Sequence, residues 1–453
     1  MTSSSSRMNE TNEASTATVK ESTIRMMTRL AQEHNAVNLS QGFPNEAPPM
    51  LLKLALAHAV LSGRPLDHCE QSSCITTEEE SLIKSLTDLL ETTTAASTTD
   101  DTGFTSLLTS TPSDVLNQYS PPMGRPDLRS SISEYYQRFY DYHVSPDDIT
   151  VTLGATEAFA SALRTVGRPG DKCVVLQPFH ELYPSQCKIF YLEPVFVTLR
   201  EEWNCWKYNP QELEDAMRHA RILILNSPHN PTGKVFSREE LQHIVQLCTR
   251  YDVFLITDEI YEHMCFDQHQ HYLIPKEFPE MKSRTLVCNS IGKSASATGW
   301  RLGWCLHPSH LSDTYRGIHD QLAVMSPHPM QYATLSYLKL PTTYFDGLAA
   351  KYQQRIHTLS DALLVAGFQV IVPQGAYYLF VGYRNVPALA GMTSMEAAMY
   401  MLKTIGVACV PGDNFFGKLS GETKNKYLRF AACRSNEDLA EAIKRIAKLS
   451  VHK

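Results

Sequence analysis

The chain has 453 residues, of which 43% are hydrophobic and 20% charged, as in an ordinary globular protein of about two domains. Its formal net charge of −7 gives no electrostatic reason to expect a nucleic acid or an anionic membrane as partner. No apolar run reaches the roughly 18 residues that a transmembrane helix needs. The eleven cysteines are scattered without a CxxC pair, which favours reduced thiols, and we assign no metal site.

Residues 1–18 are rich in Ser, Thr and Asn and lack the apolar segment of a secretory signal peptide. Arg7 is the only basic residue before Lys20, and Glu10 and Glu13 interrupt any presequence-like pattern. The composition therefore predicts a disordered tail and favours a cytoplasmic protein over a mitochondrial one.

Residues 65–113 read as a surface insertion. A capping box over 77–80 precedes apolar residues at helical spacing from Leu82 to Leu90, which predicts a short helix. Residues 92–102 are almost entirely Thr, Ala, Ser and Asp. Such a composition offers little apolar area to bury, so we expect the insertion to be dispensable for folding.

From residue 149 onward, apolar β-branched runs alternate with helical patterns such as 156–166 and 238–250. This alternation is typical of a mostly parallel sheet with helices on its faces. The expected strands are 149–153, 173–177, 221–225, 253–257, 285–289 and 302–306.

The C-terminal part mixes helices and strands in another order. Arg429 lies inside an apolar strand there, where an arginine needs a partner or a ligand. The expected helices are 309–325, 344–366, 396–404 and 437–449, and the expected strands are 368–372, 376–381 and 428–432.

Reactive and phosphate-binding side chains follow several strands of the first part. Lys293 lies just past strand 285–289, at the carboxyl end where open α/β sheets bind ligands. A lysine there could form an imine, and the nearby Ser290 and Arg301 suit a phosphate. Ala155 and Thr156 begin a helix after another strand, where backbone N–H groups can also approach a phosphate.

Two further strand ends carry polar side chains. Prolines and a glycine in 226–233 force a turn that directs two amides, Asn226 and Asn230. Asp258 closes strand 253–257, and Tyr261 follows three residues later. A carboxylate at this position can keep a pyridine nitrogen protonated, which makes the ring an electron sink.

Segments 226–233, 258–261, 290–301 and 427–430, in this order, resemble the motifs of fold-type-I, pyridoxal-phosphate-dependent class I/II aminotransferases. The likeness is nearest to the kynurenine, glutamine and methionine aminotransferase-like branch. It implies an α/β fold in which a large domain with a mainly parallel sheet flanked by helices joins a small α+β domain. It also implies a homodimer with shared active sites.

The implied domains follow the family's layout. Residues 19–45 would be the N-terminal segment of the small domain, and 46–330 the large cofactor-binding domain that carries the insertion. Residues 331–453 would form the small C-terminal domain.

The resemblance also implies roles for the cofactor, pyridoxal 5′-phosphate. Lys293 would carry it and move the substrate proton, and Asp258 would bind its pyridine nitrogen. Asn230 and Tyr261 would bind its phenolic oxygen. The phosphate would be held by Ser290, Arg301, Ala155 and Thr156, with Tyr119 contributed by the partner subunit.

The substrate side is implied in the same way. Arg429 would bind the α-carboxylate, with Gly42 and Asn230 beside it. The aromatic ring that stacks on the cofactor would be His180 or, with a shift of one residue, Phe179.

The expected reaction moves an amino group from a neutral or aromatic L-amino acid, such as methionine, glutamine or kynurenine, to a 2-oxo acid. The resemblance implies that the partner subunit contributes a pocket segment near Val324 and Met325, which is apolar and suits such side chains. The alternatives are a cysteine-S-conjugate β-lyase, an aspartate or other aminotransferase on the same fold, and a catalytically idle cofactor-binding protein.

Overall fold

The structure is a computed structural model that describes residues 22–65, 80–88, 114–417 and 426–452. The expected tail 1–18 and most of the insertion 65–113 lie outside the described residues. Across the described ranges, every helix is too short or too polar to span a bilayer.

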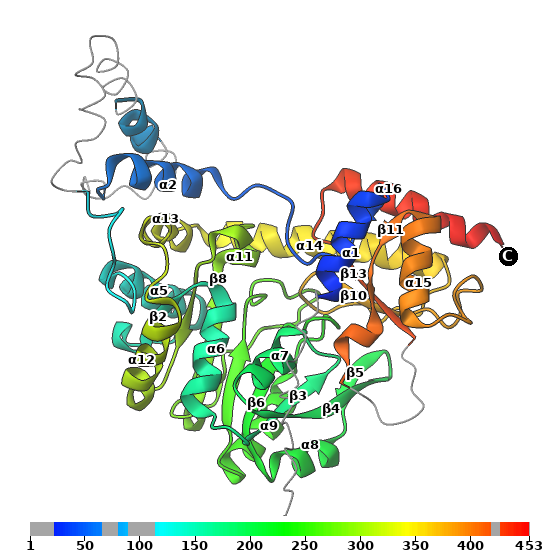
Figure 1. The fold of residues 1–453 in the computed structure, drawn as a ribbon, viewed down its shortest axis with the longest axis horizontal. Coiled ribbons are helices and arrows are strands. Elements are labelled where there is room, and N and C mark those ends of the chain that lie inside the picture. Colours follow the sequence, from blue (N-terminus) through cyan, green and yellow to red (C-terminus); the bar gives the residue numbers. More distant parts are fainter. Residues whose placement is uncertain (1–21, 66–79, 89–113, 418–425, 453) are drawn as a thin grey trace, which may run out of the picture.

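An eight-stranded sheet of order β2-β9-β8-β7-β6-β3-β4-β5 forms the centre of the larger part of the molecule (Figure 1). Strands β8, β7, β6, β3 and β4 run parallel to one another, whereas β9 pairs antiparallel with β2 and β8, and β5 pairs antiparallel with β4. The strands are β2 (Ile149–Thr152), β3 (Lys172–Gln177), β4 (Glu193–Glu202), β5 (Cys205–Tyr208), β6 (Ala220–Asn226), β7 (Phe254–Asp258), β8 (Thr285–Ser290) and β9 (Gly303–Leu306).

Both faces of this sheet are buried because alternate residues of each strand enter different apolar clusters. Val174 of β3 and Leu223 of β6 pack with one set of helices, while Val175 and Ile224 pack with the other. The expected α/β fold with a mainly parallel sheet is confirmed. The helices of this part are α5 (Pro126–Tyr140), α6 (Gly154–Val166), α7 (Leu182–Ile189), α8 (Pro210–Met217), α9 (Arg238–Arg250), α10 (Ile274–Glu277), α11 (Ile291–Ser294), α12 (Ser312–Ala323) and α13 (His328–Leu338).

The smaller part contains a three-stranded antiparallel sheet of order β10-β13-β12. Its strands are β10 (Tyr378–Gly382), β12 (Val410–Pro411) and β13 (Tyr427–Ala431), and its helices are α1 (Thr23–Glu33), α14 (Thr342–Val365), α15 (Ser394–Tyr400) and α16 (Asn436–Ile446). Near the N-terminus, β1 (Val37–Asn38) pairs in parallel with β11 (Val407–Ala408). The two ends of the chain therefore build one unit (Figure 1).

Two details differ from the expectation. Residues 368–372 are not a strand, since only Gln369 makes an isolated bridge, to Gly382. Pro373 follows and has no N–H to extend the pairing. The hairpin of β4 and β5 was not expected, because most residues of β4 are at most partly buried and its last three are charged.

Part of the expected insertion packs against the molecule. Residues 80–88 are helical, and Leu82 is only 1% exposed. Leu82 joins an apolar cluster with Leu51 and Ala55 of α2 (Met50–Ser62) and with Ala333 of α13. This contact gives the segment a role in stability that its polar composition did not suggest.

Replacing Leu82 with alanine should lower the free energy of unfolding by about 2 kcal/mol, because the buried side chain leaves a cavity. The matched control is Ile83→Ala, since Ile83 is 51% exposed and should change stability by about 0.5 kcal/mol or less. Urea unfolding of both variants measures the difference. Equal stabilities for the two would show that the 80–88 helix does not support the fold.

Candidate active site

The carboxyl ends of three parallel strands meet at one edge of the large sheet. Asn226 ends β6, Asp258 ends β7 and Ser290 ends β8, and Asn226 lies directly opposite Asp258 in the strand register. This is the edge where open α/β sheets place ligands.

Asn226 supports the turn that follows β6. Its Nδ2 donates to the backbone oxygen of Asp258 at 2.9 Å, and its Oδ1 accepts from the backbone N–H of Asn230 at 2.7 Å. The Asn230 side chain is thereby free to face the site. Its Oδ1 accepts from Arg429 at 3.1 Å, whereas its buried Nδ2 has no hydrogen-bond partner.

The Asp258 carboxylate is buried and only half satisfied. Its Oδ2 accepts from the hydroxyl of Tyr183 at 2.7 Å, while its Oδ1 is buried without a partner. Burial raises the pKa of Asp258 to about 6, although the Tyr183 hydrogen bond opposes the rise. A cationic N–H donor at Oδ1 would stabilise the ionised carboxylate.

Lys293 lies in α11, just past β8, and reaches across the site. Its Nζ donates to the backbone oxygen of Gly42 at 2.5 Å. Burial lowers the pKa of the Lys293 amine to about 8, against the attraction of Cys433 and Asp258. The neutral, nucleophilic form is therefore more populated at neutral pH than for an ordinary lysine.

Gly42 is a glycine because a side chain has no room there. A Cβ on Gly42 would lie 1.9 Å from the Tyr378 hydroxyl oxygen. The Gly42 carbonyl also accepts from the Tyr377 hydroxyl at 3.1 Å.

Arg434 fixes the segment that carries Gly42. It donates to backbone oxygens on both sides of that glycine, those of Asn38 at 2.7 Å, Gln41 at 2.9 Å and Phe43 at 2.5 Å. Sequence reasoning missed Arg434, although a second arginine so close to Arg429 in an apolar stretch was a usable signal.

Arg429 is 1% exposed and lies between the two parts of the molecule. It donates to Asn230 and to the backbone oxygen of Ser40 at 2.8 Å, and its Nε has no partner. Its guanidinium carbon lies 4.5 Å from the centre of the Tyr378 ring. A buried guanidinium with unused donor capacity is suited to binding a carboxylate.

The expected phosphate-binding residues also come together. The Arg301 guanidinium lies 3.5 Å from the Thr156 hydroxyl and 3.3 Å from the Leu153 carbonyl, at the start of α6. Ser290 pairs with Gly303 in the sheet, where a Cβ on Gly303 would lie 2.9 Å from the Ala155 nitrogen. The N–H groups at the start of α6 therefore lie close to the Arg301 guanidinium and to the strand end that carries Ser290.

The two aromatic candidates have different surroundings. Phe179 is 4% exposed and stacks on Phe196 in the core, with ring centres 5.2 Å apart. Burial, together with the positive charges of Arg429 and Lys293, lowers the pKa of His180 to about 3. His180 Nδ1 lies 3.1 Å from the backbone nitrogen of Leu182 and accepts its proton, so the neutral ring carries its own proton on Nε2.

Tyr119 is not grouped with the other residues. Its side chain is 79% exposed, and its neighbour Ser120 donates through the backbone to Met325 Sδ at 3.0 Å. Tyr119 and the Val324–Met325 pair therefore lie together at the surface of the molecule.

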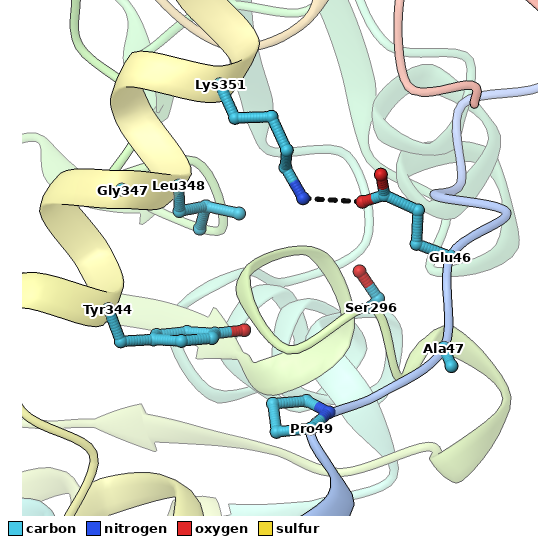
Figure 2. Close-up of a pocket in the computed structure, with 8 residues that line it drawn as sticks. All are labelled: Glu46, Ala47, Pro49, Ser296, Tyr344, Gly347, Leu348 and Lys351. Carbon is cyan, nitrogen blue, oxygen red and sulfur yellow. Dashed lines mark hydrogen bonds and ion pairs between the residues drawn. The ribbon is translucent and has the colours of Figure 1, made fainter. Parts of the chain in front are cut away.

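A cavity of about 320 Å³ borders the site without containing these residues. Figure 2 shows it between the loop after Gly42, the loop after Lys293 and helix α14, with Lys351 directed toward Glu46. Glu46 accepts from Lys351 at 2.5 Å and from Arg355 at 2.6 Å, which ties the loop to α14.

Comparison with known proteins defines the class. A sequence profile of the family described as aminotransferase class I and II matches residues 100–446, so the chain belongs to this family. Its members typically use pyridoxal phosphate.

The individual proteins to which the chain is similar are also aminotransferases. The chain is 28% identical over 452 residues to kynurenine–oxoglutarate transaminase of Dictyostelium discoideum, covering 93% of this chain and 92% of the relative. Human kynurenine–oxoglutarate transaminase 1 is also 28% identical, with 93% and 94% covered. The structure of N-succinyldiaminopimelate aminotransferase from Mycobacterium tuberculosis matches with a TM-score of 0.80 and 28% identity, over 96% of this chain and 100% of that one. Escherichia coli YbdL, identified with a methionine aminotransferase function, has a TM-score of 0.78 at 26% identity, over 95% and 98%.

The close approach at Gly42 generates a test. Gly42→Ala should lower the aminotransferase kcat/KM by roughly 100-fold, because the added methyl group displaces Tyr378 or the Gly42 carbonyl. Adding Tyr378→Phe should restore part of the loss, since the nearest clashing atom is the hydroxyl. Gly317→Ala is the control, because nothing lies within 4 Å of a Cβ there. Wild-type kinetics for Gly42→Ala would contradict the packing described.

Proposed function

We propose that this aminotransferase binds pyridoxal 5′-phosphate on Lys293 and transfers the amino group of a neutral or aromatic L-amino acid to a 2-oxo acid. The observation that carries the proposal is a set of unpaired buried polar atoms around Lys293. These atoms are Asp258 Oδ1, Asn230 Nδ2 and Arg429 Nε. Each matches a group that the cofactor or an amino-acid substrate would bring.

The residues present fit the cofactor. Asp258 Oδ1 would accept the ring N–H, and Asn230 Nδ2 and Tyr261 would donate to the ring oxygen. His180 would stack on the ring, and the phosphate would lie against Arg301 and the residues that surround it, Ala155, Thr156 and Ser290. When bound, the cofactor supplies an electron sink for the substrate Cα.

Arg429 would then bind the substrate, and Lys293 would move its proton. Arg429 orients the substrate through its carboxylate. With its amine pKa lowered to about 8 by burial, Lys293 has a neutral form that can accept the Cα proton near neutral pH. The Gly42 carbonyl, at 2.5 Å, holds the amine in place when it is not engaged.

We further propose a homodimer in which Tyr119 reaches the partner's phosphate site. The exposed position of Tyr119 and its proximity to Val324 and Met325 support this assembly, because both segments then lie at one surface. Other large apolar side chains exposed in the neighbouring α2 and the segment before Tyr119 are Met50, Val60, Leu61 and Val115.

The proposed substrate class follows from the charge of Arg429 and from the lack of charge at Val324 and Met325. Arg429 accounts for one carboxylate, and an apolar wall formed by Val324 and Met325, contributed by the partner subunit of the proposed dimer, would cost a second carboxylate several kcal/mol of desolvation. Relatives named for kynurenine and for methionine support the same class. We therefore propose methionine, glutamine, aromatic amino acids and kynurenine as donors in preference to aspartate.

The role of Asp258 is tested by Asp258→Asn, which keeps the side-chain volume but cannot carry the negative charge. We expect the variant to retain the visible absorption of bound cofactor while kcat falls roughly 100-fold or more. Tyr183→Phe is the control, because it removes only a hydrogen bond to Asp258 and should have a smaller effect. A kcat within about twofold of wild type for Asp258→Asn would contradict the proposed role.

The substrate class is tested by a donor panel ranked by kcat/KM with several 2-oxo acids. Methionine, phenylalanine or kynurenine should exceed aspartate by roughly tenfold or more, because the aspartate side chain must lose its hydration. Aspartate at the top of the ranking would overturn the substrate proposal. Assays of cysteine S-conjugates with and without an added 2-oxo acid separate amino transfer from β-elimination, which needs no acceptor.

A further inference from the structure

Tyr378 places a hydroxyl inside the site that the proposed chemistry does not use. The side chain is 2% exposed, and its oxygen lies 3.0 Å from the hydroxyl oxygen of Tyr261. The same oxygen lies 3.5 Å from the Gly42 carbonyl. Its proton therefore has two acceptors within reach, Tyr261 and Gly42.

The distances favour Tyr261 as the acceptor. The Gly42 carbonyl accepts from the Tyr377 hydroxyl at 3.1 Å, and this bond does not depend on Lys293. The contact from Tyr378 to the same carbonyl is longer, at 3.5 Å, whereas the Tyr261 hydroxyl lies 3.0 Å from Tyr378. The Tyr378 proton is therefore best placed on Tyr261.

The surrounding charges support the same direction. Burial raises the pKa of both hydroxyls, but Arg429 is the strongest opposing influence at Tyr378, whereas at Tyr261 it is a minor one. Asp258 raises the pKa of Tyr261 as well, while Cys433 raises that of Tyr378. With Arg429 beside its ring, Tyr378 is the more acidic phenol and hence the better donor of the pair.

We propose that Tyr378 is a positioning residue, whose hydroxyl donates to Tyr261 and so directs the Tyr261 proton to the ring oxygen of the bound cofactor. A hydroxyl that accepts one hydrogen bond donates a stronger one, since the bonds polarise each other. Tyr378 thus strengthens the contact of Tyr261 with the cofactor without touching the cofactor itself. The inference rests on the proposed cofactor and on the proposed role of Tyr261.

The test is a pH titration of the visible absorption of the cofactor-loaded enzyme. Donation to the ring oxygen stabilises its anionic form, so weaker donation favours the protonated chromophore and raises the titration midpoint. Tyr378→Phe should raise the midpoint by roughly 0.5 pH unit, and Tyr261→Phe should raise it further. In the double variant, Tyr378→Phe should add nothing to Tyr261→Phe, because its effect passes through that hydroxyl.

Tyr352→Phe is the matched control. Tyr352 belongs to the same aromatic cluster, 5.3 Å from the Tyr377 ring, and its buried hydroxyl has no partner. Removing the Tyr352 hydroxyl should leave the midpoint unchanged. The variant thereby shows that deleting a buried hydroxyl does not in general move the midpoint. Thermal unfolding of each variant, with bound cofactor, confirms that the comparison is made on folded protein.

Two results would overturn the inference. One is an unchanged midpoint in Tyr378→Phe, and the other is an additive shift in the double variant, which would mean that Tyr378 acts independently of Tyr261. In both cases the wild-type band remains, and the proposed cofactor with it. Absence of a visible band from wild-type protein supplied with pyridoxal phosphate would overturn the proposed function and the inference together.

Discussion

Two buried arginines hold segment 38–43 against the carboxyl edge of the large sheet, and the arrangement of the site depends on this contact. Arg434 is bonded to the carbonyls of Asn38, Gln41 and Phe43, and Arg429 to that of Ser40. Hydrogen bonds from a charged guanidinium are stronger than neutral ones, and leaving such a group unpaired in the interior is costly. The segment is therefore fixed, and the Gly42 carbonyl meets Lys293 as a result.

Three buried polar atoms of the site have no hydrogen-bond partner within the protein. Buried polar groups in folded proteins are almost always hydrogen-bonded, and each exception costs about 1–3 kcal/mol. Asp258, Asn230 and Arg429 each have one buried polar atom without a hydrogen-bond partner in this site. Each of the three residues is otherwise positioned by hydrogen bonds to neighbouring groups. Groups that are oriented but unsatisfied are preorganised for a ligand, because binding it requires little rearrangement.

The sequence was most informative where one strand or one turn carries the signal. Strands such as β8 are apolar and buried on both faces, so their runs stand out, and the polar residue that ends each run falls at the ligand-binding edge. Helix α9 was predicted with its observed bounds from its helical pattern, and in the structure a capping box of Ser237 and Glu240 fixes its start. The positions of Lys293, Asp258 and Asn230 near one another follow from these elements.

Interactions between distant segments were not predictable in the same way. Tyr183 supports Asp258 from 75 residues away, and Tyr378 meets Gly42 across 336 residues. No periodicity or turn encodes such pairs, since they arise from tertiary packing, of α7 against β7 in the first case and of β10 against the segment of Gly42 in the second. Strand β4 was missed because its mixture of exposed and buried residues weakens the apolar pattern.

The central claim, that Lys293 is the residue at which the cofactor acts, is tested most directly by chemical trapping. The enzyme loaded with pyridoxal phosphate would be reduced with borohydride, digested and analysed by mass spectrometry for the pyridoxyl group. The account predicts one labelled peptide that contains Lys293, with labelling prevented by Lys293→Ala. Label on a different lysine in the wild-type protein, or no stable label after reduction, would contradict it.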